Sequence, residues 1–272
     1  MAARPSRETP MTSEVQSLLR GLSLLEALAE FDTRGASLQE LSEKTSLSPS
    51  TAHRLLTTFV EADYVTRGRE RSSYVLGHRI IGIAGSVQLR TAHLRVIVRP
   101  YLEAIAEESG ETANLVALDG RSSVYIDQAE GKRVLHMSIR VGSTFPANTS
   151  ASAKAILAFQ NPEQALRLIF GDGRAKRYTR RTIVQADAFR ADLQSTRERG
   201  FAIEREEVDE GVSCIAAPIL DRKGVAIAAV SVPGPTTRIL NPTPDRLGNL
   251  ILAHTAKISQ ALGARYLARR PI

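Results

Sequence analysis

The chain has 272 residues, enough for one large domain or two small ones, and a usual domain size of about 100–200 residues favours two. Hydrophobic residues make up 43% and charged residues 24%, a composition typical of globular proteins. The single cysteine, Cys214, excludes an internal disulfide framework and a multi-thiolate metal site within one chain. Because no apolar run approaches the roughly 18 residues of a membrane span and the N-terminus lacks the apolar core of a secretory signal, we expect a cytoplasmic protein without a membrane partner.

The net charge of +7 is spread unevenly along the chain. Residues 1–90 hold 11 Lys and Arg against 10 Asp and Glu, whereas residues 91–272 hold 25 against 19. The overall charge is therefore weak evidence for nucleic-acid binding, and the placement of individual arginines matters more.

Residues 13–77 show the pattern of three short helices followed by a hairpin. Ser37 and Ser48 stand where helix N-caps are needed; Glu40 completes a capping box with Ser37, and Pro49 occupies a first helical turn. The expected elements are, in chain order, a disordered arm at 1–12, helices at 15–29, 38–45 and 49–62, and β-segments at 64–66 and 74–76 around a polar tip.

Three helices and a hairpin within about 60 residues indicate a winged helix-turn-helix. The short connection between the second and third helices makes them cross steeply, which leaves one face of the third helix free to enter a major groove of double-stranded DNA. The candidate DNA contacts on that face are Ser50, Thr51, His53, Arg54 and Thr57. The hairpin tip adds three candidates at phosphate or minor-groove distance, Arg67, Arg69 and Arg71. The alternatives to DNA contact are that Arg54 lies on a solvated helix surface, that His53 packs or caps locally, and that the hairpin-tip arginines only increase solubility.

A second domain of α+β type is expected from about residue 91. Beyond Gly110 the apolar period changes from helical spacing to two, which is typical of strands. The expected elements are linker helices within 78–109 with a kink or break at Pro100, strands at 112–118, 122–128 and 133–139, helices at 150–159, 162–170 and 186–199, a strand hairpin of 213–220 and 225–232, and a terminal helix around 247–262. The predicted domains are thus residues 13–77 and 91–268. The basic residues of 172–182 are expected to form an exposed loop.

The chain resembles the IclR family of bacterial transcriptional regulators in three stretches. The family's DNA-binding domain is similar to SLQELSEKTSLSPSTAHRLLTTFVEADYV (37–65) with the later YVLG, and its effector-binding domain to GFAIEREEVDEGVSCIAAPILDRKGVAIAAVSVPGP (200–235). Between them, RVGSTFPANTSASAKAILAF (140–159) resembles the segment lining the family's ligand pocket. The likeness extends from about Glu14 to Arg265, and the 200–235 block is its most specific part.

The resemblance implies a two-domain α+β transcription factor with an N-terminal winged helix-turn-helix and a C-terminal domain similar to GAF and PAS sensory modules. It implies a homo-oligomer, either a dimer through the DNA-binding halves or a dimer of dimers, without a cofactor. Effectors in the family are commonly small organic acids, including intermediates of aromatic degradation. We therefore expect operator DNA and a small carboxylate as partners.

The resemblance also carries an effector pocket onto this sequence. The residues that match are Met137, Ala151, Ser152, Glu204, Cys214 and Ser231, and Val134 is expected to join Met137 as an apolar wall. The N-terminus of the 150–159 helix is a candidate anion site. Glu204 repels an anion unless the carboxyl is protonated or orients a hydroxyl or amine of the effector, and both alternatives stay open. Ala153 replaces a glycine common in the family.

Two other functions need consideration. A thiol enzyme or hydrolase on the same fold would use Cys214, but no histidine motif accompanies it, so a pocket-lining or buried, inert thiol is favoured over catalysis. The five histidines lack paired spacing, and no metal site is expected. A protein-interaction scaffold without a DNA role is the second alternative.

Overall fold

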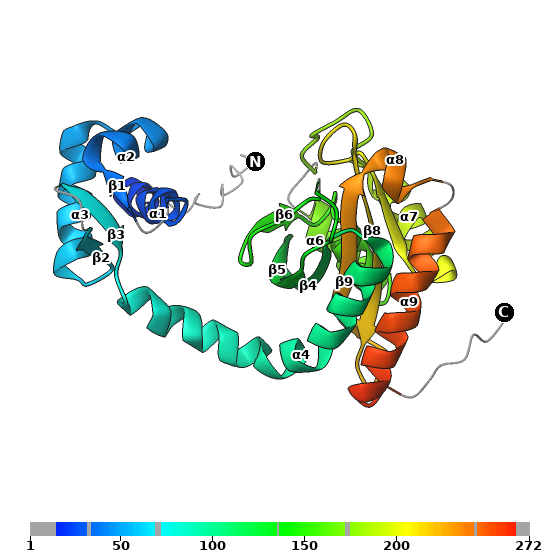
Figure 1. Ribbon diagram of the computed structural model, residues 1–272. Coiled ribbons are helices and arrows are strands. Elements are labelled where there is room, and N and C mark those ends of the chain that lie inside the picture. The colour runs from blue at the N-terminus through cyan, green and yellow to red at the C-terminus, as the bar shows by residue number, and fades with distance from the viewer. Residues whose placement is uncertain are drawn as a thin grey trace, which may run out of the picture. The chain divides into compact units, whose positions relative to one another are not determined.

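The computed structural model describes residues 15–31, 34–68, 72–134, 136–171, 175–241 and 244–264, with the backbone alone at 87–90 (Figure 1). The chain divides into two units, residues 1–90 (unit 1) and 91–272 (unit 2). The arm expected at 1–12 lies outside the described residues. None of the described helices is long and apolar enough to cross a membrane.

Unit 1 is a winged helix-turn-helix. Its helices are α1 (Gln16–Ala29), α2 (Leu38–Thr45) and α3 (Pro49–Glu61), and its strands are β1 (Ala36–Ser37), β2 (Val65–Arg67) and β3 (Ser73–Leu76). The strands form an antiparallel sheet in the order β1-β3-β2, in which the two-residue β1 was not predicted. The three helices meet over one small core, in which Leu24, Leu41 and Leu56 are fully buried.

The predicted helix starts in unit 1 are confirmed. The Ser37 hydroxyl accepts a hydrogen bond from the Glu40 backbone N–H at 3.2 Å, and the Glu40 carboxylate accepts one from the Ser37 N–H at 2.8 Å. The Ser48 hydroxyl caps α3 through the Thr51 N–H, with Pro49 in the first turn. Caps of this kind satisfy N–H groups that have no partner inside the helix, which is why they mark helix starts in sequence.

One continuous helix, α4 (Arg79–Ser109), replaces the two predicted linker helices. Of the kink or break expected at Pro100, the break is therefore wrong. Proline removes one backbone hydrogen bond, but Val98, Leu102 and Ile105 are fully buried on both sides of it. Their burial against the unit 2 core stabilises the helix across the proline.

Unit 2 contains a six-stranded antiparallel sheet in the order β6-β5-β4-β9-β8-β7. Its strands are β4 (Ala113–Asp119), β5 (Ser122–Ala129), β6 (Thr144–Pro146), β7 (Ala202–Arg205), β8 (Val212–Leu220) and β9 (Ala226–Pro235). Its further helices are α5 (Ala151–Leu157), α6 (Pro162–Phe170), α7 (Ala186–Arg199), α8 (Thr236–Ile239) and α9 (Pro244–Ala261). The α+β two-domain prediction is confirmed, while the short β6, β7 and α8 were missed.

The strand predicted at 133–139 is wrong. Its described residues are irregular, and β5 is paired by β4 on one side and by β6 on the other. The Gly142 N–H donates to the Tyr125 carbonyl at 2.8 Å, which brings the chain back to β5 only after the predicted strand has passed. None of the described residues of 133–139 therefore pairs with a strand.

The sheet separates two apolar layers. Along β9, Ala228, Val230 and Val232 point to the layer that also holds α4 and α9, whereas Ala229 points to α5. Helix α5 is buried along its whole length, because the sheet covers one side and α7 lies on the other. In Figure 1, α9 runs along the sheet beside β8.

The basic segment expected to be an exposed loop is only partly exposed. Residues 172–174 lie outside the described chain, and Ala175 and Thr182 are buried. The Thr182 hydroxyl donates to the Glu207 carbonyl at 2.7 Å, and the Thr179 hydroxyl donates to the Glu206 carbonyl at 2.7 Å. These bonds fasten the loop to the segment that follows β7.

Candidate nucleic-acid interface and ligand site

The outer face of α3 is open, as a DNA-reading helix requires. Ser50, His53, Arg54 and Thr57 are exposed and Thr51 is half-buried, whereas Ala52 and Leu56 are fully buried on the opposite side. This separation follows from the three- and four-residue spacing of a helix.

The side chains on this face differ in their freedom. Those of His53 and Arg54 make no hydrogen bond or ion pair with any other described residue. The Thr51 hydroxyl is engaged by Ser48 at 2.9 Å, and the Thr57 hydroxyl donates to the His53 carbonyl at 2.9 Å. Arg54 is therefore the strongest candidate for reading a base or a phosphate.

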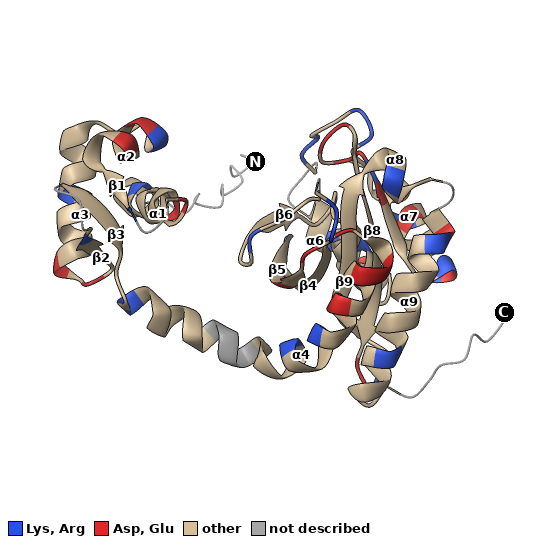
Figure 2. Cartoon of the chain, viewed as in Figure 1, with Lys and Arg blue, Asp and Glu red and all other residues tan. Residues whose placement is uncertain are grey.

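The hairpin presents Arg67 at the end of β2. Its guanidinium lies over the Tyr74 ring, 4.3 Å from the ring centroid, while its side chain stays exposed. The other predicted wing contacts, Arg69 and Arg71, lie outside the described residues. Charges of both signs are dispersed over both units (Figure 2), which agrees with the even balance counted in residues 1–90.

In unit 2, polar side chains from four strands lie on the sheet face that α5 covers. Ser231 on β9 is the register partner of both Asn114 on β4 and Ala216 on β8. Glu204 on β7 is the partner of Cys214 on β8, and Ser152 is buried in α5. Cys214 and Ala216 pack with α5, so their register partners share that face. With Tyr125, whose pKa responds to Cys214 and Glu204, they form what we call the polar cluster: Asn114, Tyr125, Ser152, Glu204, Cys214 and Ser231.

Several atoms of the polar cluster are buried without a hydrogen-bond partner among the described residues. They are both amide atoms of Asn114 and the hydroxyl oxygens of Ser152 and Ser231. Leaving a buried polar group unpaired costs about 1–3 kcal/mol, and such groups cluster where something else supplies the missing bonds. The polar cluster is therefore a candidate ligand site, with hydrogen-bond donors and acceptors aimed at the same face of the sheet.

Among the six residues of the polar cluster, Glu204 alone carries a carboxyl group, and its side chain is buried. The pKa of this carboxyl is raised to about 7, mainly by burial and also by the neighbouring Glu207 carboxylate, against the opposing effect of hydrogen bonds from the Glu207 and Val208 N–H groups and of the charge of Lys154. Glu204 thus changes its charge near neutral pH, which allows it to donate or to accept a hydrogen bond.

Cys214 and Tyr125 stay neutral. Burial raises the pKa of the Cys214 thiol, and the Glu204 carboxylate adds to the effect. Burial likewise raises the pKa of Tyr125. A nucleophilic cysteine needs a lowered pKa, so this environment opposes thiol catalysis and suits a pocket-lining thiol.

A buried ion-pair network adjoins the polar cluster and was missed in the sequence. The Lys154 side chain is completely buried, and its ammonium lies 2.5 Å from Glu207 Oε1 and 3.0 Å from Asp192 Oδ2. The Glu207 N–H donates to the Glu204 carboxylate. A lysine inside the otherwise small and apolar run ASAKAILAF was the available signal. The network joins α5, α7 and the segment after β7.

Two predicted pocket residues lie in the irregular 131–143 segment. Val134 is completely exposed, so the expectation that it forms an apolar wall is wrong in this structure, because the strand that would have oriented it does not form. Met137 is half-buried. Ala151 is buried with α5 against the sheet, as expected. The Ser150 hydroxyl accepts from the Ala153 N–H at 3.3 Å, so the helix N-terminus is already partly capped.

A winged helix-turn-helix joined by one long helix to a sheet domain with a buried polar cluster defines a class, the two-domain transcriptional regulators that respond to a small molecule. Residues 17–69 match the profile described as the IclR helix-turn-helix domain, and residues 87–260 match that of the bacterial transcriptional regulator IclR C-terminal domain. The chain belongs to the IclR family. It is a DNA-binding transcriptional regulator and not an enzyme.

Relatives agree over nearly the whole length. The chain is 36% identical to the transcriptional repressor IclR of Escherichia coli (strain K12), over 93% of this chain and 92% of that protein. The crystal structure of the Thermotoga maritima IclR has a TM-score of 0.72 and 28% identity, covering 92% of this chain and 100% of the other. An IclR homolog complexed with 4-hydroxybenzoate, from Microbacterium hydrocarbonoxydans, has a TM-score of 0.68 and 23% identity, covering 91% and 99%.

Proposed function

We propose that the chain is a cytoplasmic, homo-oligomeric repressor whose affinity for operator DNA changes when a small hydroxylated organic acid binds at the polar cluster. Residues 13–77 read DNA, residues 91–268 bind the effector, and residues 78–109 connect them. The observation that carries the proposal is the set of buried, unpartnered polar atoms of Asn114, Ser152 and Ser231 beside Glu204.

DNA is read by α3 in a major groove, through Ser50, Thr51, His53, Arg54 and Thr57. The exposed and unpaired Arg54 suits a bidentate contact with guanine or a phosphate. The wing, with Arg67, Arg69 and Arg71, contacts the phosphate backbone or the minor groove. The assignment of these roles follows from the exposed face of α3 and the position of Arg67 at the start of the wing.

A second copy of the chain is the proposed partner of α1. Val15, Leu18, Leu19 and Leu22 recur at helical spacing and are 42–62% exposed, so they form an apolar stripe that the unit 1 core does not use. Covering this stripe with its copy pairs two winged helices, and two-fold symmetry then favours a pseudo-palindromic operator. Dimers associate further through unit 2 in the proposed dimer of dimers.

The effector class follows from the chemistry of the polar cluster. The hydroxyls of Ser152 and Ser231 and the amide of Asn114 offer donors to a carboxylate. Glu204 in its protonated form donates a further hydrogen bond, which removes the repulsion that an ionised carboxyl would cause. A hydroxylated carboxylic acid uses both kinds of group. The bound 4-hydroxybenzoate of the Microbacterium hydrocarbonoxydans homolog is an acid of this class.

The signal passes through the sheet. Strands β4 and β9 carry Asn114 and Ser231 on the face toward α5, and their neighbours Leu115 and Val230 pack in the layer that contains α4. A shift of these strands on ligand binding therefore displaces the C-terminal half of α4, which is packed against them. The same helix continues along the chain to unit 1. Typical couplings between effector and ligand sites are about 1–3 kcal/mol.

Fluorescence anisotropy with DNA from upstream of the chain's own gene, in the presence and absence of 4-hydroxybenzoate and other small acids, tests the proposal. A Ser152→Ala, Ser231→Ala double variant is expected to bind DNA like the wild type and to lose the effector response. Loss of the response with retained DNA binding supports the assignment, and an unchanged response places the effector elsewhere.

A further inference from the structure

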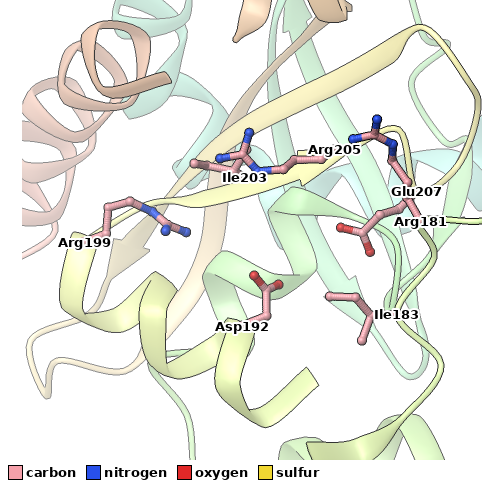
Figure 3. Close-up of a pocket in the computed structure, with 7 residues that line it drawn as sticks. All are labelled: Arg181, Ile183, Asp192, Arg199, Ile203, Arg205 and Glu207. Atoms are coloured by element: carbon pink, nitrogen blue, oxygen red, sulfur yellow. The ribbon is translucent and has the colours of Figure 1, made fainter. Parts of the chain in front are cut away.

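A pocket of about 340 Å³ lies beside β7, an edge strand of the unit 2 sheet (Figure 3). We call it the β7 crevice. Its walls are two apolar side chains, Ile183 and Ile203, two carboxylates, Asp192 and Glu207, and three guanidinium groups, those of Arg181, Arg199 and Arg205. Its volume is at the lower end of the range of small-molecule sites.

The β7 crevice is separate from the polar cluster. Ile203 and Arg205 flank Glu204 on β7, so their side chains point to the opposite face of the strand. Ile203 accordingly packs in the layer of α4 and α9, while the register partner of Glu204, Cys214, packs with α5. None of the crevice walls belongs to the polar cluster.

Arg199 is held in place at one end of the crevice. Its Nε donates to the Phe201 carbonyl at 2.9 Å, and its guanidinium lies over the Phe201 ring, 5.2 Å from the centroid. Burial lowers the pKa of Arg199, and the charge of Arg205 lowers it further, while Asp192 and Asp245 oppose the shift. The fixed guanidinium is thus close to a second positive charge.

The Arg205 side chain is exposed and makes no hydrogen bond or ion pair with any other described residue. Figure 3 shows the guanidinium groups of Arg199 and Arg205 on the same side of Asp192. Two adjacent like charges repel each other, and an oxyanion between them removes the repulsion while accepting their N–H groups. Arg181 is less available, because it pairs with Glu206 at 3.1 Å.

Glu207 supplies the second observation. Its side chain is 5% exposed and lines the crevice, and Oε2 is buried without a hydrogen-bond partner among the described residues, since Lys154 is bonded to Oε1. A carboxylate oxygen accepts hydrogen bonds and donates none unless it is protonated. The missing partner is therefore a hydrogen-bond donor.

We propose that the β7 crevice binds a second small molecule, a hydroxylated organic anion whose carboxylate or phosphate group lies between Arg199 and Arg205 and whose hydroxyl group donates to Glu207. The site is additional to the effector site at the polar cluster. The apolar side chains of Ile183 and Ile203 contact the carbon skeleton of the ligand.

The two sites share one structural element. Glu207 lines the crevice with its side chain, holds Lys154 of α5, and donates its backbone N–H to Glu204 of the polar cluster. A ligand that shifts Glu207 therefore changes the environment of Glu204, and by linkage each ligand alters the affinity for the other equally. This coupling rests on the proposed effector site, whereas binding in the crevice does not.

Isothermal titration calorimetry of the full chain, at a constant ionic strength near 0.15 M, tests the site with three probes. Malate carries carboxylates and a hydroxyl, succinate lacks the hydroxyl, and glycerol 3-phosphate offers a phosphate. We expect saturable binding of malate or of glycerol 3-phosphate, and at least tenfold weaker binding of succinate than of malate. The better of the two binders shows whether a carboxylate or a phosphate is preferred.

Variants locate the binding. Arg205→Gln and Arg199→Gln are expected to weaken it at least tenfold, whereas Arg222→Gln, an exposed arginine in the β8–β9 turn, and Ser231→Ala leave it unchanged. Because the Arg205 side chain is exposed and unpaired, the Arg205→Gln variant is expected to keep the fold. It therefore tests binding in the β7 crevice even if Arg199→Gln unfolds. Absence of binding by all three probes, or equal binding by wild type and Arg205→Gln, overturns the proposal. If Ser231→Ala abolishes binding of the probe, the anion binds at the polar cluster instead. A failure of the protein to bind DNA contradicts only the proposed function.

Discussion

Glu204 on β7 stands directly opposite Cys214 on β8, so that a buried carboxyl and a partly buried thiol are register partners in the sheet. Burial raises the pKa of both groups, that of Glu204 to about 7, and the Glu204 carboxylate raises the pKa of the thiol further. The pair explains why the thiol stays neutral and why the carboxyl is the group whose charge responds to conditions near neutral pH.

The stability of the protein should fall as the pH rises from about 4.5 to 7. In this range an unfolded Glu204 carboxyl, with its ordinary value near 4.5, releases its proton, while the buried one, with a pKa of about 7, retains it. The unfolded state then binds fewer protons, so the free energy of unfolding decreases with pH and levels off above 7. Urea unfolding at pH 5, 6, 7 and 8 measures this dependence. A Glu204→Gln variant should show a flatter profile, and an unchanged profile contradicts the assignment.

Binding of an acidic effector should take up a proton above pH 7. If the protonated Glu204 donates to the effector, ionisation must be reversed before binding, and the affinity falls about tenfold per pH unit well above the pKa. Calorimetry of the effector in two buffers of different ionisation enthalpy counts the protons. In Glu204→Gln the uptake should vanish while binding persists. An affinity that rises with pH instead indicates that the ionised carboxylate orients a donor group of the effector.

Replacing Arg54 should weaken operator binding more than replacing a distant arginine. An Arg54→Ala change removes a free guanidinium from the exposed face of α3 and is expected to cost about 1–3 kcal/mol for a base contact. Arg67→Ala should weaken binding uniformly across sequences and reduce the salt slope by about one. Anisotropy titrations at several salt concentrations provide the measurement, with Arg222→Ala as the matched control. Operator affinity that tolerates both changes removes the proposed interface.

Removing the charge of Lys154 should destabilise unit 2 strongly. A Lys154→Met change leaves the buried Glu207 and the half-buried Asp192 without their shared cation. Removing one partner of a buried ion pair costs about 3–5 kcal/mol. The matched control is Lys44→Met, which removes an exposed pair with Glu30 at 2.8 Å and should cost below about 1 kcal/mol. Chemical unfolding of the two variants gives the comparison. Adding Glu207→Gln to Lys154→Met should recover part of the loss.

A charge on the apolar stripe of α1 should dissociate the proposed dimer. Leu18 is 61% exposed, so Leu18→Glu is compatible with the folded unit but places a carboxylate in the interface. Sedimentation velocity is expected to show a smaller species and DNA binding to weaken in parallel. Val225→Glu, at a residue 41% exposed in unit 2, is the control that should leave the assembly intact. An unchanged assembly in Leu18→Glu moves the interface away from α1.

Local chemistry in the sequence was sufficient to predict most elements. The Ser37–Glu40 capping box and the Ser48–Pro49 start were predicted at the residues where they occur, and the ranges 162–170 and 186–199 match α6 and α7. Caps and helical spacing depend on residues within one or two turns, so the sequence displays them directly. The family resemblance identified four members of the polar cluster, Ser152, Glu204, Cys214 and Ser231, but not Asn114 or Tyr125, which lie outside the matched stretches.

Tertiary structure decided what depends on distant partners. Packing of Val98, Leu102 and Ile105 stabilises α4 across Pro100, and the described residues of 133–139, which pair with no strand, are irregular and leave Val134 exposed. Strand register placed Glu204 opposite Cys214, and burial, which no local pattern encodes, raised the pKa of that carboxyl. The meeting of Lys154 with Glu207, 53 residues later in the chain, likewise required the folded sheet, because charges far apart in sequence are paired only by the fold.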